Sequence, residues 1–130
     1  SLFYNTPQNI DLEKCPFLID EKNVNKIRLA KDIIVDRMVS PPTLAELADE
    51  IQLPLNRLKE GFKQVYGDTV YGFLFDYRME QARQFLASGS YNVNEVSAKI
   101  GYSAASHFIV AFRRKYGTTP KKYLDGLIHS

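Results

Sequence analysis

The sequence lacks the features that would point to a secreted or membrane-embedded protein. Its 130 residues include a single cysteine, Cys15, and no tryptophan. One cysteine cannot form an internal disulfide bond, so we expect a reducing compartment, the cytoplasm. No apolar run reaches the ~18 residues that a membrane span needs, and no secretory signal is visible at the N-terminus. We therefore expect no membrane association.

Patterns typical of catalysis and metal binding are missing as well. The two histidines, His107 and His129, have no cysteine or histidine neighbour at the spacing of a metal site. The sequence shows no nucleophile–base pairing and no glycine-rich phosphate loop. We expect neither an enzyme nor a bound cofactor or metal ion.

Charge is spread unevenly along the chain, although the net charge is only +2. Residues 1–50 carry six basic and nine acidic side chains, whereas residues 101–130 carry five basic and one acidic. The asymmetry predicts a basic surface at the C-terminal end, which suits a polyanionic partner but also suits an ordinary solvated face.

Helical periodicity is what the sequence does contain. Apolar residues recur every three or four positions from about residue 22 onward, which predicts an all-α domain. The first apolar stripe consists of Val24, Ile27, Ala30, Ile34 and Met38. The expected helices, about seven in number, cover roughly 22–38, 43–51, 54–66, 70–87, 93–100, 103–116 and 120–128. At ~1.5 Å per residue the helix over 70–87 is about 27 Å long.

Cap residues support these boundaries. Polar side chains that can accept an orphan backbone N–H favour helix starts, and glycine favours helix ends. Proline at a first helical position loses no hydrogen bond, which predicts helix starts at Pro54 and Pro120. The expected caps are Thr43 with Glu46, Thr69, Asn92 with Glu95, Ser103 and Thr119 at helix starts, and Gly67, Gly101 and Gly117 at helix ends.

The two halves of the chain repeat each other. Leu44, Glu46, Leu47 and Ile51 match Val93, Glu95, Val96 and Ile100 at an offset of 49. Leu58, Phe62, Tyr66, Gly67, Thr69 and Leu74 match Phe108, Phe112, Tyr116, Gly117, Thr119 and Leu124 at an offset of 50. We therefore predict a tail over 1–20, helix-turn-helix units over 21–68 and 89–130, and a connecting helix over 69–88.

Two homeodomain-like helix-turn-helix units joined by a long helix indicate double-stranded DNA as the partner. A connector of about 27 Å can hold two reading helices in successive major grooves, which recur about every 34 Å. The alternative is an all-α repeat that packs well and binds no nucleic acid.

The second unit carries the residues that resemble a known family. Ile100–Ser103, Ser106–Phe108, Ala111–Arg114, Tyr116–Pro120 and Tyr123 are similar in order and spacing to the AraC/XylS DNA-binding domain. The resemblance covers residues ~22–126. It implies a bacterial transcription regulator, usually an activator that contacts RNA polymerase, with an effector or dimerisation domain N-terminal to this part and absent here.

The resemblance implies base contacts from both reading helices. In the first helix these are Asn56, Lys59 and Glu60, which can pair with adenine, guanine and cytosine N4 respectively. In the second helix they are Ala105, Ser106 and Val110, of which alanine and valine offer only apolar contact, for example to a thymine methyl. Positions that match phosphate contacts are Arg57, Lys63, Ser103, His107, Arg113 and Arg114.

Departures from the family pattern shape further expectations. The family often has glycine where this chain has Gln52 and serine at Pro54, so we expect an atypical first turn. It often has arginine where this chain has Glu60, which argues against a guanine contact there. It commonly has arginine at Val110, where valine offers only apolar contact, so the second unit is expected to supply affinity and shape readout more than base specificity. An alternative function is a helical protein-interaction module that docks polymerase or a regulatory domain with little DNA specificity. Residues 59–67 and 77–82 look most similar to the branch that responds to iron–siderophore complexes.

Overall fold

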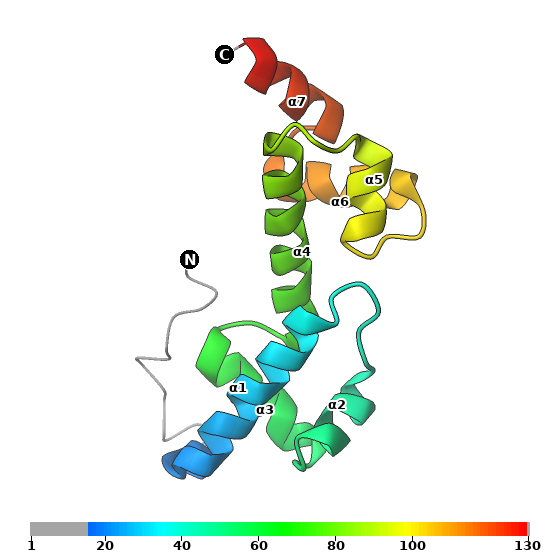
Figure 1. Ribbon diagram of the computed structural model, residues 1–130. Helices are drawn as coiled ribbons and strands as arrows, with labels where there is room; N and C mark the ends of the chain where they lie inside the picture. Colours follow the sequence, from blue (N-terminus) through cyan, green and yellow to red (C-terminus); the bar gives the residue numbers. More distant parts are fainter. Residues whose placement is uncertain (1–15, 130) are drawn as a thin grey trace. The chain divides into compact units, whose positions relative to one another are not determined.

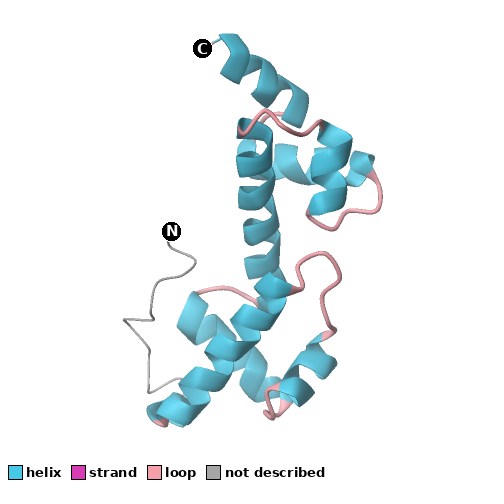
Figure 2. Ribbon diagram, viewed as in Figure 1, coloured by secondary structure: helices cyan, strands magenta, loops and turns pink. Residues whose placement is uncertain are grey.

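The computed structural model describes residues 16–129, and over that range every regular element is helical (Figures 1 and 2). The predicted all-α fold with about seven helices is confirmed. Residues 1–15 of the expected tail, Cys15 among them, lie outside the described residues. The elements are a short 3-10 helix η2 (Pro16–Ile19) and the helices α1 (Glu21–Asp36), α2 (Leu44–Glu50), α3 (Leu55–Tyr66), α4 (Val70–Ala87), α5 (Val93–Lys99), α6 (Ala105–Tyr116) and α7 (Pro120–His129).

The described residues form two compact units. The first contains η2, α1, Pro41–Leu74 and therefore α2, α3 and the first turn of α4. The second contains Met38–Ser40 and everything from Phe75 onward, which includes the rest of α4 with α5, α6 and α7.

Both units begin their helix-turn-helix with the same capping box. Thr43 Oγ1 accepts the Glu46 amide at 3.1 Å, and the Thr43 amide donates to Glu46 Oε1 at 3.0 Å. Asn92 Oδ1 and Glu95 repeat this pair at 2.8 and 3.0 Å. The backbone and hydroxyl donors of Thr43 lower the pKa of Glu46 below its ordinary value. Both expected capping boxes are thus confirmed, and they satisfy amides that helix starts leave open.

Three expected boundaries are wrong by one or two residues. Helix α3 begins at Leu55, and Pro54 stands before it with ψ 147°, because the turn leaves Pro54 in an extended conformation. Helix α6 is preceded by Ala104 in extended backbone (φ −130°, ψ 128°) and has no side-chain cap, so Ser103 is not its N-cap. The Tyr102 ring, which precedes this extended segment, packs against Phe108 with centroids 5.9 Å apart.

Met38 was the third misplaced residue. Helix α1 ends at Asp36, so Met38 does not continue its apolar stripe, and its side chain packs in the second unit instead. The Arg78 guanidinium holds this segment there, since its Nε donates to the Met38 carbonyl at 2.8 Å and its Nη2 donates to the same oxygen. Burial lowers the pKa of Arg78 below its ordinary value. Arg78 is therefore a structural residue of the second unit.

The periodic aromatic residues fill the two cores. Phe62 in the first unit and Phe108 and Phe112 in the second are fully buried, as their four-residue spacing indicates. They are core residues and not platforms for stacked bases. The remaining core of the second unit consists of Met79, Ala82, Leu86, Val96, Ile100 and Ala111.

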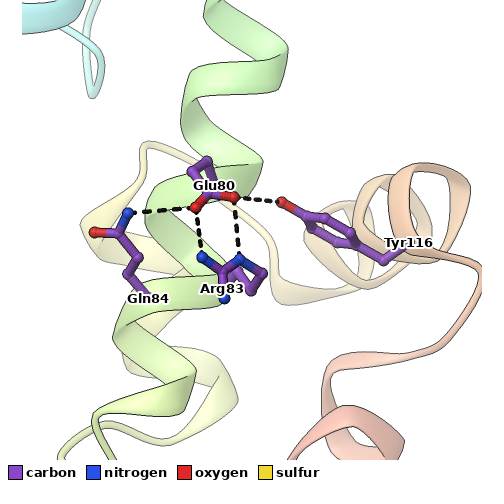
Figure 3. A network of polar contacts seen from close by, with 4 residues as sticks. All are labelled: Glu80, Arg83, Gln84 and Tyr116. Carbon is purple, nitrogen blue, oxygen red and sulfur yellow. Dashed lines mark hydrogen bonds and ion pairs between the residues drawn. The ribbon is translucent and has the colours of Figure 1, made fainter. Parts of the chain in front are cut away.

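A polar network joins α4 to α6 within the second unit (Figure 3). Glu80 lies between Arg83, which donates from Nε at 3.1 Å and also from Nη2, and Tyr116, whose hydroxyl donates at 3.4 Å. Gln84 Nε2 donates to the same carboxylate at 3.4 Å. These donors lower the pKa of Glu80, while burial first and the Glu80 charge second raise the pKa of Tyr116 to about 12. The network fixes α6 against the helix on which it packs.

Candidate nucleic-acid interface

The turn between α2 and α3 forces a non-glycine residue into the left-handed region. Gln52 has φ +59°, and it is the only described non-glycine residue with a positive φ. Its carbonyl accepts a hydrogen bond from Lys26 Nζ at 3.3 Å. The left-handed conformation costs an L-residue about 1–2 kcal/mol, which agrees with the atypical first turn that the sequence predicts.

Helix α3 presents a charged and amide-bearing face to solvent. Leu58, Phe62 and Val65 point into the core of the first unit. One turn apart on the opposite side, the exposed residues are Asn56, Lys59, Glu60 and Lys63. Three predicted base-contacting residues and one predicted phosphate-contacting residue therefore share one exposed face, which we call the α3 reading face.

Arg57, a predicted phosphate contact, flanks the α3 reading face. Its Nη1 lies 3.7 Å from Glu60 Oε2, and its guanidinium carbon lies 5.4 Å from the centre of the Phe17 ring. Phe17 belongs to η2 and approaches α3 closely because Gly61 has no side chain: a Cβ there would lie 2.6 Å from Phe17 Cζ. Arg57 is thus held beside the reading face by both an acidic and an aromatic neighbour.

The turn between α5 and α6 uses a glycine where the first turn uses glutamine. Gly101 has φ +102°, and a Cβ at this position would lie 2.9 Å from the Val39 Cα, the Val39 carbonyl oxygen and Arg78 Nη2. The Tyr102 amide donates to the Ser97 carbonyl at 3.0 Å and closes the turn. Both the backbone conformation and the lack of space require glycine here.

Helix α6 presents a face of the same geometry and different chemistry. Phe108, Ala111 and Phe112 are buried, and the outward residues are Ser106, Ile109, Val110 and Arg113, which we call the α6 reading face. Ala105 is half-buried at the first position of the helix. Of the predicted residues, the structure brings Ser106 and Val110 together on this face and places Ala105 at its edge.

Basic and polar side chains surround the α6 reading face. His107 and Ser103 are exposed near the start of the helix, at positions that suit the predicted phosphate contacts. Arg113 is exposed and has no ion pair within residues 16–129. Arg114 lies over the Phe75 ring at 4.6 Å, and Lys115 pairs with Asp76 at 2.9 Å. Among the arginine and lysine side chains of α6, Arg113 is therefore the one for which the described residues provide neither an ion-pair partner nor an aromatic ring.

Ile109 lies on the α6 reading face and is not among the site residues predicted from the sequence. The offset of 50 that relates the two reading helices pairs Ile109 with Lys59, just as it pairs Val110 with Glu60. That offset was visible in the sequence and would have selected Ile109 ahead of Ala105, whose counterpart is Leu55. The assignment of individual residues to bases or phosphates stays a prediction.

The chain resembles known proteins over most of its described length. A family model described as a helix-turn-helix domain matches residues 47–126. The xylose operon regulatory protein of Escherichia coli (strain K12) is 31% identical over 80 residues, which cover 62% of this chain and 20% of that protein. This chain thus spans about a fifth of the length of that relative.

Solved structures show the same fold. The C-terminal domain of AraT, a response regulator from Geobacillus stearothermophilus, matches with a TM-score of 0.72 and 26% identity over 78% of this chain and 84% of that one. The DNA-binding domain of AdpA, solved in complex with a target DNA, matches with a TM-score of 0.71 and 20% identity over 78% and 91% of the two chains. Within residues 16–129, no helix is long and apolar enough to cross a membrane.

Proposed function

Since this chain belongs to the AraC/XylS family of helix-turn-helix transcription regulators, which are DNA-binding proteins and not enzymes, we propose that it binds duplex DNA in a sequence-specific manner with α3 and α6 in successive major grooves. The observation that carries this proposal is that both units have the same helix-turn-helix arrangement. Each has a capped short helix, a tight turn and a second helix whose outward face is free of core contacts. Helix α4 has 18 residues, or about 27 Å, a length that suits grooves about 34 Å apart.

Base discrimination in this proposal comes mainly from the α3 reading face. Asn56 can bond adenine, Lys59 can bond guanine, and Glu60 can accept from cytosine N4, because the major groove displays a distinct pattern for each base pair. The phosphate contacts are assigned to Arg57, Lys63, Ser103, His107, Arg113 and Arg114. They set affinity and register, since phosphates carry no sequence information directly.

Salt dependence tests the proposal. Each neutralised phosphate releases counterions, so the dissociation constant for duplex DNA should rise steeply between about 50 and 200 mM salt. Lys63→Ala should reduce the slope of log affinity against log salt by about one. Lys22→Ala, which removes the same charge from an exposed position on α1, is the matched control and should leave the slope unchanged. A flat salt dependence, or no binding to duplex DNA at low salt, would overturn the proposal.

The intact regulator is proposed to carry an effector or dimerisation domain N-terminal to this chain and to contact RNA polymerase. The share of the xylose operon regulatory protein that this chain spans supports a longer protein. A regulator of this kind acts on the chromosome, so we place it in the bacterial cytoplasm. Transcription in vitro with purified polymerase tests this contact. Promoter output should change when the full-length protein is added. Output should stay unchanged with a variant that binds DNA but does not contact RNA polymerase.

We assign the effector to the iron–siderophore class, on the resemblance of residues 59–67 and 77–82 alone. A reporter driven by the regulated promoter should respond to a ferric siderophore only when the full-length protein is present. If the reporter responds equally in iron-free medium and with every siderophore tested, the iron–siderophore assignment is rejected. The DNA-binding proposal is not affected by that result.

A further inference from the structure

The α6 reading face is apolar where a DNA-reading helix usually offers hydrogen-bonding groups. Val110 is 68% exposed, more than any other large hydrophobic residue among those described, and the neighbouring Ile109 is 36% exposed. Neither contributes to the buried core of the second unit. Two adjacent aliphatic side chains are therefore exposed at the centre of the α6 reading face.

The same four positions on the two reading helices differ in chemistry. On α3 they hold Asn56, Lys59, Glu60 and Lys63. On α6, fifty residues later, they hold Ser106, Ile109, Val110 and Arg113. The polar first position and the basic last position are retained, and the two central charged residues are replaced by isoleucine and valine. The change is therefore confined to the centre of the face.

Charge identifies the occupant of the α6 reading face. Helix α6 contains no acidic residue, and the aliphatic pair lies between Ser106 and Arg113, with His107 and Arg114, seven residues apart, exposed along one edge of the face. A major groove is bordered by two rows of phosphates and suits an apolar centre with a basic border. An apolar protein partner would not need the unpaired arginine.

The chemistry of the major groove then limits what the aliphatic pair can recognise. Base edges there display acceptors, amino donors and one apolar group, the C5-methyl of thymine. An aliphatic side chain pressed against an acceptor or donor removes its water without replacing the hydrogen bond, which is unfavourable. Contact with a methyl group buries apolar surface on both sides and is favourable.

We propose that Ile109 and Val110 read thymine C5-methyl groups at adjacent base pairs of the second half-site, and that Ile109 is a specificity residue of this chain. The second unit therefore selects by methyl contact, while the first unit selects by hydrogen bonds. This inference rests on the proposed function, because it requires α6 to enter a major groove.

Methyl substitution of the DNA tests the inference directly. Each thymine of a selected operator is replaced in turn by uracil, which removes only the C5-methyl and keeps every hydrogen-bonding group. One or two positions of the second half-site should lose about three- to fivefold in affinity, the value of one buried methyl group. At the same positions a 5-methylcytosine·guanine pair should bind tighter than a cytosine·guanine pair by a similar factor.

Variants of the chain locate the effect. In the double variant Ile109→Ala with Val110→Ala, the affinity ratio of thymine to uracil duplexes should fall close to one. Leu29→Ala, which trims another exposed aliphatic residue on α1, is the matched control and should keep the full ratio. Both target side chains are exposed, so folding should be retained, and Val110→Ala alone carries the test if the double variant does not fold.

The outcomes separate this inference from the proposed function. Operator preference with no uracil effect in the second half-site, or a uracil effect that survives in the double variant, overturns methyl reading and leaves the α6 reading face to another partner. Loss of all preference for the operator over random DNA instead overturns the proposed function.

Discussion

The two helix-turn-helix units of this chain have the same skeleton and different surfaces. Capping boxes at Thr43 and Asn92 match, as do the left-handed glycine ends of α3 and α6 with φ of 78° and 75°. The turns and the reading faces differ. Positions that determine the fold are thus repeated, while positions on the exposed reading faces have diverged, which is expected if each unit contacts a different sequence.

The largest difference between the units should appear at the turns. Gly101→Ala places a Cβ 2.9 Å from the Val39 backbone at a φ of +102°, and neither the backbone nor Arg78 leaves room. We expect the free energy of unfolding of the second unit to fall by about 2–4 kcal/mol. Urea titration followed by circular dichroism measures this.

Gly126→Ala is the matched control, because a Cβ there meets nothing within 4 Å. It should leave stability unchanged or raise it by about 0.5–1 kcal/mol. Equal losses in both variants would show that the second turn does not need glycine for the reason given.

At the reading faces we expect a smaller effect, a change in binding affinity that depends on the DNA sequence. Lys59→Ala should relax preference at one base position of the first half-site by about 1–3 kcal/mol, because it removes a hydrogen bond to a base edge. Binding to a panel of single-base operator variants measures this. If Lys59→Ala weakens binding to every operator variant equally, Lys59 contacts phosphate and the first unit does not read bases as proposed.

The first turn should respond in the opposite sense to the second. Gln52→Gly relieves a left-handed glutamine and should raise the free energy of unfolding by about 0.5–1 kcal/mol, the relief being partly offset by the greater entropy of glycine in the unfolded chain. Gln52→Ala keeps the same φ and should give no gain. A loss of stability in Gln52→Gly would contradict the strain assigned to this turn.

The smallest effect concerns one buried hydroxyl. Ser97 is 2% exposed, and its Oγ has no hydrogen-bond partner among the described residues, whereas the repeat places Ala48 at the same point of the first unit. Ser97→Ala should raise stability by about 0.5 kcal/mol, since it removes an unsatisfied polar group. Ala48→Ser should lower stability in the first unit. Thermal unfolding of the two variants checks both signs.

Local patterns predicted most of the fold, because helix periodicity, capping boxes and glycine ends depend on residues close in sequence. The starts of α3 and α6 were misplaced by one and two residues respectively, since the extended conformations of Pro54 and Ala104 are set by the turns before them. Met38 and Arg78 could not be placed, because their contact spans forty residues and no local period records it.

The reading faces could be predicted in part. Exposure of Asn56, Lys59 and Glu60 follows from the buried stripe on the other side of α3. Ile109 was overlooked because an isoleucine on a helix ordinarily belongs to the core, and only its 36% exposure and its pairing with Lys59 by the repeat show otherwise.

Selection of binding sites from random duplex DNA with this chain tests the central claim most directly. We expect an enriched site with two half-sites centred about 10–10.5 base pairs apart. One half-site should lose its preference in Lys59→Ala, and the other should be rich in thymine. Enrichment of a single half-site, or of no sequence at all, would contradict the claim that both units read DNA.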